Sequence, residues 1–202
     1  MIVTAHLYLV RHGQTAWSES GRHTGISDVP LTTHGVQQAR RAGAVLARLR
    51  GTDLPPALAL CSTRERSWRT AELVGLDAEK TEALAEWDYG DYEGLTTEQI
   101  REQVPGWTVW THPCPNGETA EQVRDRAALV VDEARAGLRK GDVVLVGHGH
   151  FTRAVIATWL GLGPEDGVRF ALDPAGIAVL GDERGTPQVR SLNVPAWELA
   201  SD

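Results

Sequence analysis

Cysteine is scarce in this 202-residue sequence, which contains only Cys61 and Cys114. Two cysteines outside a C-x-x-C pair make neither a disulfide framework nor a thiolate metal motif. This pattern is typical of a protein with reduced thiols, so we expect a cytoplasmic location. Phenylalanine and tyrosine are also few, at two and three residues, whereas tryptophan is frequent at seven. The aromatic packing should therefore depend on where the tryptophans lie.

Long apolar runs and basic runs are absent as well. No stretch of about 18 consecutive apolar residues occurs, which excludes a typical transmembrane helix. The first residues lack a basic segment followed by an apolar one, so we expect no signal peptide. Lys and Arg total 20 against 27 Asp and Glu, which gives a net charge of −7. Because nucleic acids and anionic membranes attract basic surfaces, we expect neither as a partner.

Along the chain, short apolar runs alternate with amphipathic segments. Strands are expected over 6–10, 57–61, 142–146, 169–172, 176–181 and 188–192, the last two forming a hairpin. Helices are expected over 32–50, 64–74, 97–104, 119–139 and 149–160, and loops over 11–30 and 83–94. Strands that alternate with helices predict an α/β fold. We expect a three-layer α/β/α sandwich with a mostly parallel central sheet, in a single domain spanning 1–202.

Polar clusters follow three of the expected strands, at Arg11-His12, at 62–66 and at His148. Ligands of such sheets bind at the carboxyl ends of the strands, so these clusters should meet. An imidazole beside a guanidinium suits an anion, and Gly13 could admit a ligand close to the backbone. A surface basic loop is the alternative for Arg11 to Gly13.

The other clusters also allow two interpretations each. His148 lies between two glycines before a helix, where free N–H groups favour an anion, although a helix-capping loop fits equally. A metal pair of His148 and His150 is disfavoured, because no matching ligand motif accompanies it. The run 62–71 could be a solvated helix face. The acidic, aromatic segment 84–94 could be a lid, or it could hold a carboxyl group that donates a proton.

Four motifs in this order resemble those of the histidine phosphatase superfamily, which is phosphoglycerate-mutase-like in fold. The R-H-G motif is matched by Arg11, His12 and Gly13. The pattern S-P-L-x-R-A-x-x-T-A is matched over 62–71 with departures at Thr63, Arg64 and Ser67, and Arg66 stands at its arginine position. The acidic-loop pattern is matched by Leu84, Glu86, Gly90, Glu93 and Gly94, and V-x-H-G-x-x-x-R by Val146, His148, Gly149 and Arg153.

The resemblance implies roles for particular residues. His12 would be the nucleophile that forms a phosphohistidine, while Arg11, Arg66 and an imidazolium at His148 would hold the phosphoryl oxygens. Glu86 would protonate the leaving oxygen and then activate water, so an acidic to neutral pH optimum is expected. No metal and no other cofactor is implied. Substrate-binding positions of relatives correspond to Gln14, Thr15, Thr24, Gly25, Tyr89 and Gly149.

Longer stretches favour one branch of this family, with phosphatases such as sedoheptulose-1,7-bisphosphatases and bacterial acid phosphatases. These stretches are 11–18, 86–96, 107–118, 147–150 and 172–180. We expect a metal-independent phosphatase for small phosphorylated metabolites, with 84–120 as a lid-like insertion over the pocket. A cofactor-dependent phosphoglycerate mutase is one alternative, although the basic insertion of such mutases is missing. A protein phosphohistidine or phosphotyrosine phosphatase is the other. Relatives are often homodimers or larger, so a homo-oligomer is also expected.

Overall fold

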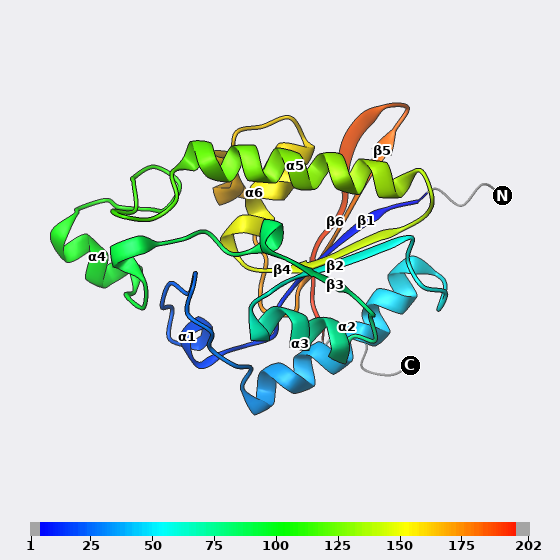
Figure 1. The fold of residues 1–202 in the computed structure, drawn as a ribbon, viewed down its shortest axis with the longest axis horizontal. Helices are drawn as coiled ribbons and strands as arrows, with labels where there is room; N and C mark the ends of the chain where they lie inside the picture. The colour runs from blue at the N-terminus through cyan, green and yellow to red at the C-terminus, as the bar shows by residue number, and fades with distance from the viewer. Residues whose placement is uncertain (1–4, 197–202) are drawn as a thin grey trace.

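A central sheet organises the computed structural model, which describes residues 5–196. Its strands are β1 (Leu7–Arg11), β2 (Leu58–Ser62), β3 (Glu79–Thr81), β4 (Val143–Gly147), β5 (Ile177–Glu183) and β6 (Thr186–Val194). They follow the order β3-β2-β4-β1-β5-β6 (Figure 1). Pairing is parallel from β3 to β1, whereas β5 is antiparallel to β1 and β6 to β5. The expected mostly parallel sheet is confirmed.

Helices cover both faces of this sheet. They are α1 (Ala16–Glu19), α2 (Thr33–Arg50), α3 (Glu65–Leu73), α4 (Thr97–Gln103), α5 (Ala120–Leu138) and α6 (His150–Trp159). In Figure 1, α5 and α6 lie above the sheet and α2 and α3 below it. Within residues 5–196, no helix combines the length and hydropathy that a membrane span requires.

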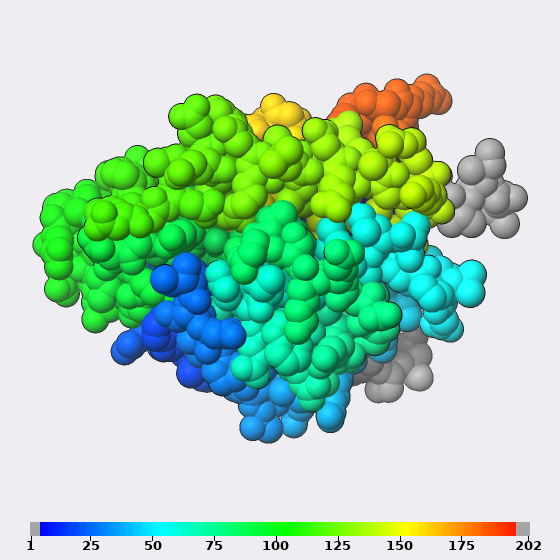
Figure 2. All heavy atoms as spheres, in the orientation of Figure 1, coloured from blue at the N-terminus to red at the C-terminus, as the bar shows by residue number. Residues whose placement is uncertain are grey.

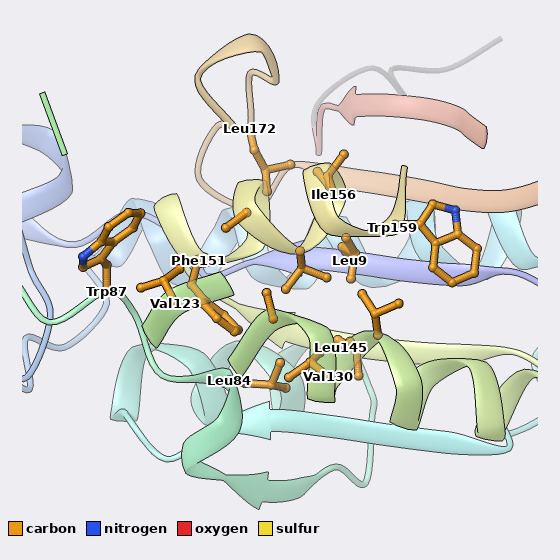
Figure 3. Close-up of a cluster of buried hydrophobic side chains, with 14 of the residues drawn as sticks. Leu9, Leu84, Trp87, Val123, Val130, Leu145, Phe151, Ile156, Trp159 and Leu172 are labelled. Atoms are coloured by element: carbon orange, nitrogen blue, oxygen red, sulfur yellow. The ribbon is translucent and has the colours of Figure 1, made fainter. Parts of the chain in front are cut away.

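Alternating side chains of β1 show how the layers form. Leu7 and Leu9 are buried in a cluster with α5 and α6, which Figure 3 shows around Leu9. Tyr8 and Val10 point to the opposite face and join a second buried cluster with α2. Because successive strand residues face opposite sides, a strand that is apolar throughout can serve two cores. The apolar runs of the sequence therefore correspond to strands covered on both faces.

The predicted strand over 169–172 is wrong. Residues Pro164–Arg169 form a 3-10 helix, η3, which begins with a proline and contains an Asp166–Arg169 ion pair of 2.7 Å. The carbonyl of Leu172 accepts a hydrogen bond from Arg11 Nη1 at 2.6 Å instead of pairing with a strand. A proline preorganises the first turn of a helix, so η3 includes Arg169, whereas residues 170–172 form neither helix nor strand.

Two short elements, β3 and α1, were not predicted from the sequence. The edge strand β3 consists of Glu79, Lys80 and Thr81, so it has no apolar alternation. Charged residues are common on edge strands because one side meets solvent. Helix α1 has four residues and is fixed by a capping box between Thr15 and Ser18. An element of one turn is too short to show a helical period.

The segment 84–120 lies at one end of the molecule, drawn green in Figures 1 and 2. It contains the 3-10 helix η2 (Gly90–Tyr92) and α4. It pairs with the loop after α1, because His23 N donates to Leu95 O and Gly94 N donates to His23 O, both at 2.9 Å. Trp107 and Trp110 are buried within it. Its action as a lid stays a prediction.

Candidate active site

His12 follows directly on β1 and is fixed by its backbone. Its N–H donates to Gly147 O at 2.9 Å, and its carbonyl accepts from Ala175 N at 3.0 Å. The ring Nδ1 lies 2.7 Å from Gly13 O. A carbonyl only accepts, so this contact assigns the proton to Nδ1 and leaves the lone pair on Nε2. Burial, Arg66 and Arg11 lower the pKa of His12 well below 6.5. A neutral, tautomerically fixed imidazole can act as a nucleophile.

Gly13 allows close packing against α2, whereas the sequence led us to expect that it admits a ligand. A Cβ at this position would overlap the carbonyl of Gly35, near the start of α2. The N–H of Gly13 donates to Thr70 Oγ1 at 3.1 Å, which ties it to α3 as well. The glycine therefore lets α2 approach the histidine loop closely. The expectation that it admits a ligand is wrong, because helix backbone fills that space.

Arg66 comes from α3 and is completely buried. Its Nη1 donates to Ser27 O at 2.7 Å, and its Nη2 donates to Thr24 O at 2.9 Å and Gly25 O at 3.1 Å. Its Nε donates to Nδ1 of His148 at 3.2 Å. The guanidinium thus connects α3 to the loop after α1 and to the end of β4. A buried charge is costly unless hydrogen bonds satisfy it, and these four contacts do so.

His148 follows β4 and shares this arrangement. Because Arg66 Nε donates to its Nδ1, the neutral ring carries its proton on Nε2. Burial, followed by the charge of Arg66, lowers the pKa of His148 well below 6.5. The expected imidazolium is therefore wrong in this structure, and a neutral imidazole takes its place. Its ring lies 5.3 Å from that of His12.

Two buried donors near His12 lack partners within residues 5–196. They are Nε2 of His148 and Nε of Arg11. Arg11 is otherwise held through Nη1, which donates to Leu172 O at 2.6 Å. Native proteins pair nearly all buried donors, so two that remain unpaired beside one nucleophile are unusual. The oxygens of a phosphoryl group would accept from both.

Glu86 is held at the start of α6. Its Oε1 accepts from the backbone N–H groups of Phe151 at 2.7 Å and Trp87 at 2.9 Å. Its Oε2 accepts from His150 N at 2.9 Å. Free N–H groups at a helix N-terminus favour a carboxylate acceptor. The surroundings of Glu86 are thus polar as well as aromatic, and the carboxyl group lines the same cavity as His12.

Arg126 of α5 supports the chain on both sides of Glu86. Its Nη1 donates to Ala85 O at 2.7 Å and Ala83 O at 3.1 Å. It also pairs with Glu118 through Nη2 at 2.7 Å and Nε at 3.0 Å. Glu118 in turn accepts from Asp88 N at 3.0 Å. Sequence patterns did not identify Arg126 as a support of Glu86, because the two residues are distant along the chain.

A cavity of about 240 Å³ joins these groups. It brings together His12, Glu86, Arg11, Thr24, Tyr89 and Gly149 from the predicted set, whereas Arg66 and His148, which are bonded to each other, are not among its lining residues. Gln14, Thr15 and Gly25 do not line it. Gln14 Oε1 accepts from Thr32, Thr15 caps α1, and Gly25 N donates to Glu93. Seven lining residues were not among the predicted site residues: Ser18, Gly21, Arg22, His23, Thr97, His150 and Arg153.

Neutral rings form one side of the cavity. Burial raises the pKa of Tyr89 well above 10, so its hydroxyl stays protonated. It lies 2.6 Å from Nδ1 of His150, whose own pKa burial lowers well below 6.5. The hydroxyl therefore donates to Nδ1, and the proton of His150 lies on Nε2. His23 stacks beside Tyr89 at 4.7 Å between ring centroids, and burial lowers its pKa to about 4.

The arrangement combines a neutral histidine and a carboxyl group in one cavity with nearby guanidinium and imidazole groups. This class of site transfers phosphoryl groups through histidine. Within residues 5–196, no three His, Cys, Asp or Glu side chains lie together as a metal site would require.

The chain belongs to the histidine phosphatase superfamily, branch 1, whose family model matches residues 7–195. It is 50% identical over 189 residues to an acid phosphatase of Mycobacterium tuberculosis, covering 93% of this chain and 92% of that protein. It is 34% identical over 188 residues to sedoheptulose 1,7-bisphosphatase of Saccharomyces cerevisiae, covering 80% and 69%. These relatives confirm the expected resemblance to the phosphatase branch.

Two further comparisons concern the fold of the chain and its similarity to a phosphoglycerate mutase. A solved structure of an open reading frame product of Mycobacterium tuberculosis superposes with a TM-score of 0.91 at 49% identity, covering 95% of this chain and 98% of that one. A 2,3-bisphosphoglycerate-dependent phosphoglycerate mutase of Azorhizobium caulinodans is 38% identical over 176 residues, covering 79% and 83%. The fold is therefore that of phosphoglycerate-mutase-like histidine phosphatases.

The buried histidines predict an acid-sensitive fold. The pKa values of His12, His148 and His150 lie well below 6.5 and that of His23 is about 4, so the folded state leaves them neutral. The unfolded chain binds these protons as the pH falls through about 6.5. The free energy of unfolding should therefore be highest above about pH 7 and fall by at least about 2 kcal/mol by pH 5.5. Urea titrations at several pH values measure this.

His23→Gln keeps a polar group that can hydrogen-bond to Thr97, and it should make the fall in the free energy of unfolding shallower. His34→Gln, at an exposed position on α2, is the matched control and should leave the fall unchanged. A free energy of unfolding that stays constant from pH 7 to pH 5.5 would contradict the prediction.

Proposed function

We propose that the protein is a metal-independent phosphatase that hydrolyses small phosphomonoesters through a phosphohistidine on His12. The observation that carries this proposal is the lone pair fixed on His12 Nε2 by the Gly13 carbonyl, next to two unpaired buried donors. A small phosphorylated metabolite, either a sugar phosphate or a phosphorylated acid, is the proposed partner. The size of the cavity, about 240 Å³, supports a small substrate.

In the first step, His12 Nε2 attacks phosphorus and the P–O bond to the alcohol breaks. Glu86 gives a proton to the leaving oxygen. The charges of Arg11 and Arg66 and the Nε2–H of His148 neutralise the phosphoryl oxygens, since phosphoryl transfer needs mainly positioning and charge stabilisation. Arg66 is already bound to three carbonyls, so it contributes largely as a fixed charge.

In the second step, water attacks the phosphohistidine. Glu86 takes a proton from that water, the P–N bond breaks, and the electron pair returns to Nε2. Inorganic phosphate leaves, and His12 is again neutral with its proton on Nδ1. One carboxyl group thus serves as acid and then as base, which requires it to lie beside the nucleophile for both steps.

Hydrolysis is favoured over mutase activity by the relative at 50% identity, which is an acid phosphatase. Arg101, the arginine of α4, donates through Nε to Trp107 O at 2.9 Å, so its side chain is already hydrogen-bonded within the segment 84–120. A mutase must shield its phosphoenzyme from water, whereas a phosphatase must admit water. The 38% identity to a phosphoglycerate mutase keeps mutase activity as the second candidate.

The direct test is a panel of phosphomonoesters assayed with EDTA present. Sugar phosphates, phosphoglycerates and a phosphopeptide should be compared for the wild type and His12→Ala. We expect phosphate release from small substrates, unchanged by EDTA, and a loss of at least about 10³-fold in His12→Ala because the nucleophile is gone. Circular dichroism of the variant controls for folding.

Three results would count against the proposal. Loss of activity with EDTA would point to a metal-dependent reaction. Interconversion of phosphoglycerates faster than phosphate release would indicate a mutase. Activity on the phosphopeptide alone would indicate a protein phosphatase.

Arg126 is expected to act as a positioning residue for Glu86. Arg126→Gln removes its bonds to Ala85 O and Glu118, so Glu86 should be less well placed to protonate the leaving oxygen. An alkyl phosphate has a poor leaving group that needs this proton, whereas p-nitrophenyl phosphate does not. We expect kcat/KM to fall about tenfold or more for the alkyl substrate and much less for the aryl one.

Glu86→Gln should show the same dependence on the leaving group, more strongly. Arg126→Lys keeps the charge and should recover part of the activity. Arg124→Gln, an exposed arginine of the same helix, is the control. An equal loss on both substrates in Arg126→Gln would assign it a purely structural role.

A further inference from the structure

A turn over residues 172–176, between η3 and β5, lies beside the end of β1 and contacts both residues of the R-H pair. The N–H of Ala175 donates to the carbonyl of His12 at 3.0 Å. The carbonyl of Leu172 accepts from Nη1 of Arg11 at 2.6 Å. The turn therefore fixes the backbone of His12 and one nitrogen of the Arg11 guanidinium.

The direction of the Arg11 side chain depends on this contact. Within residues 5–196, the bond to Leu172 O is the one hydrogen bond of its guanidinium, and its buried Nε has no partner. Burial lowers the pKa of Arg11, whereas the negative charges of Glu86 and Asp173 raise it. A guanidinium held at one nitrogen turns when its acceptor moves. The place of Leu172 O thus decides which donors face a phosphoryl group.

Ala175 shows that the turn is held in an unfavourable conformation. The residue is fully buried, and its φ of 58° lies in the left-handed region, where residues other than glycine are uncommon. Such a conformation persists only where the surrounding contacts impose it. The turn should therefore relax when those contacts are removed.

Asp173 and Asn193 supply such contacts from β6. The N–H of Asp173 donates to Oδ1 of Asn193 at 2.7 Å, and Nδ2 of Asn193 donates to Oδ2 of Asp173 at 2.8 Å. The same Oδ1 lies against Gly176, where an added Cβ would come within 2.5 Å of it. Inside the turn, the N–H of Gly176 donates to the carbonyl of Asp173 at 2.8 Å. One asparagine thus contacts the turn at two points.

Asn193 reaches the turn because β6 is irregular at that point. The register of β5 with β6 shifts between Ile177 and Val179, so β6 carries one extra residue there. Asn193 itself has a φ of 51°, a left-handed conformation that asparagine adopts more readily than most residues. A β-bulge can redirect a side chain. Here the irregularity directs the Asn193 amide toward Asp173.

We propose that Asp173 and Asn193 are positioning residues for the phosphoryl-transfer site. By holding the turn, they keep Leu172 O against Arg11 and so direct the guanidinium toward the phosphoryl oxygens. Neither residue lines the cavity, so their effect passes through the turn. The inference rests on the proposed phosphatase activity and adds to its site two residues that lie outside the sequence motifs.

Asn193→Ala removes both hydrogen bonds of the pair. Arg11 acts on the phosphoryl oxygens, which are the same in an alkyl phosphate and in p-nitrophenyl phosphate. We therefore expect kcat/KM to fall about tenfold for both substrates alike. The Kd of inorganic phosphate, measured by titration calorimetry, should rise about fivefold or more. Asp173→Ala should behave in the same way, whereas Asp173→Asn keeps a side-chain acceptor and should retain most of the activity.

A double-mutant cycle separates positioning from general stability. Arg11→Lys removes the guanidinium that reaches Leu172 O, so in that background Asn193→Ala should change kcat/KM by less than about threefold. Gln188→Ala is the matched control, because it removes an exposed amide–carboxylate contact of 2.9 Å with Glu183 on the same hairpin. This control should keep the wild-type kcat/KM. Circular dichroism measures folding, and Asp173→Ala replaces Asn193→Ala in the cycle if the latter does not fold.

Equal losses in the wild-type and Arg11→Lys backgrounds would overturn the inference, since the pair would then act independently of Arg11. Unchanged kcat/KM in Asn193→Ala would overturn it as well, and the phosphatase proposal would stand. Absence of phosphate release from every ester by the wild type would instead defeat the proposed function. Phosphate binding then decides on the pair, because an unchanged Kd in Asn193→Ala would refute its positioning role.

Discussion

The buried guanidinium of Arg66 is the contact on which the site depends. It satisfies its charge with the carbonyls of Thr24, Gly25 and Ser27 and with Nδ1 of His148, so it joins three segments far apart in sequence. Burial, followed by this charge, lowers the pKa of His12 and His148. Arg66 therefore joins the segments of the pocket and helps to keep His12 neutral.

The carboxyl group of Glu86, which lines the same cavity as His12, is placed by a second set of contacts. Peptide N–H groups at the start of α6 hold Glu86, and the pair of Arg126 with Glu118 holds the chain around it. Both sets depend on the packing of α5 and α6 against one face of the sheet. The hydrophobic core in Figure 3 thus fixes the geometry of the acid as well as the stability of the fold.

Sequence patterns predicted the elements that depend on local chemistry. The apolar runs of β1, β2 and β4, the helices α2, α5 and α6, and the catalytic motifs were all readable. The charged edge strand β3 has no apolar alternation, and the predicted strand over 169–172 is absent because Arg169 ends η3 and residues 170–172 belong to no strand. Features that arise from packing between distant segments could not be predicted from the sequence. They are the contact of Gly13 with Gly35, the neutral state of His148, and the support that Arg126 gives to Glu86.

The Gly13 carbonyl fixes the tautomer of His12 and thereby selects Nε2 as the proposed nucleophile. The most direct measurement is ³¹P NMR of the phosphoenzyme after rapid quenching in alkali and digestion, which distinguishes the two phosphohistidine isomers. Phosphate bound to Nε2 of His12 is the predicted result. Phosphate on Nδ1, on another residue, or on no residue while hydrolysis proceeds would contradict it.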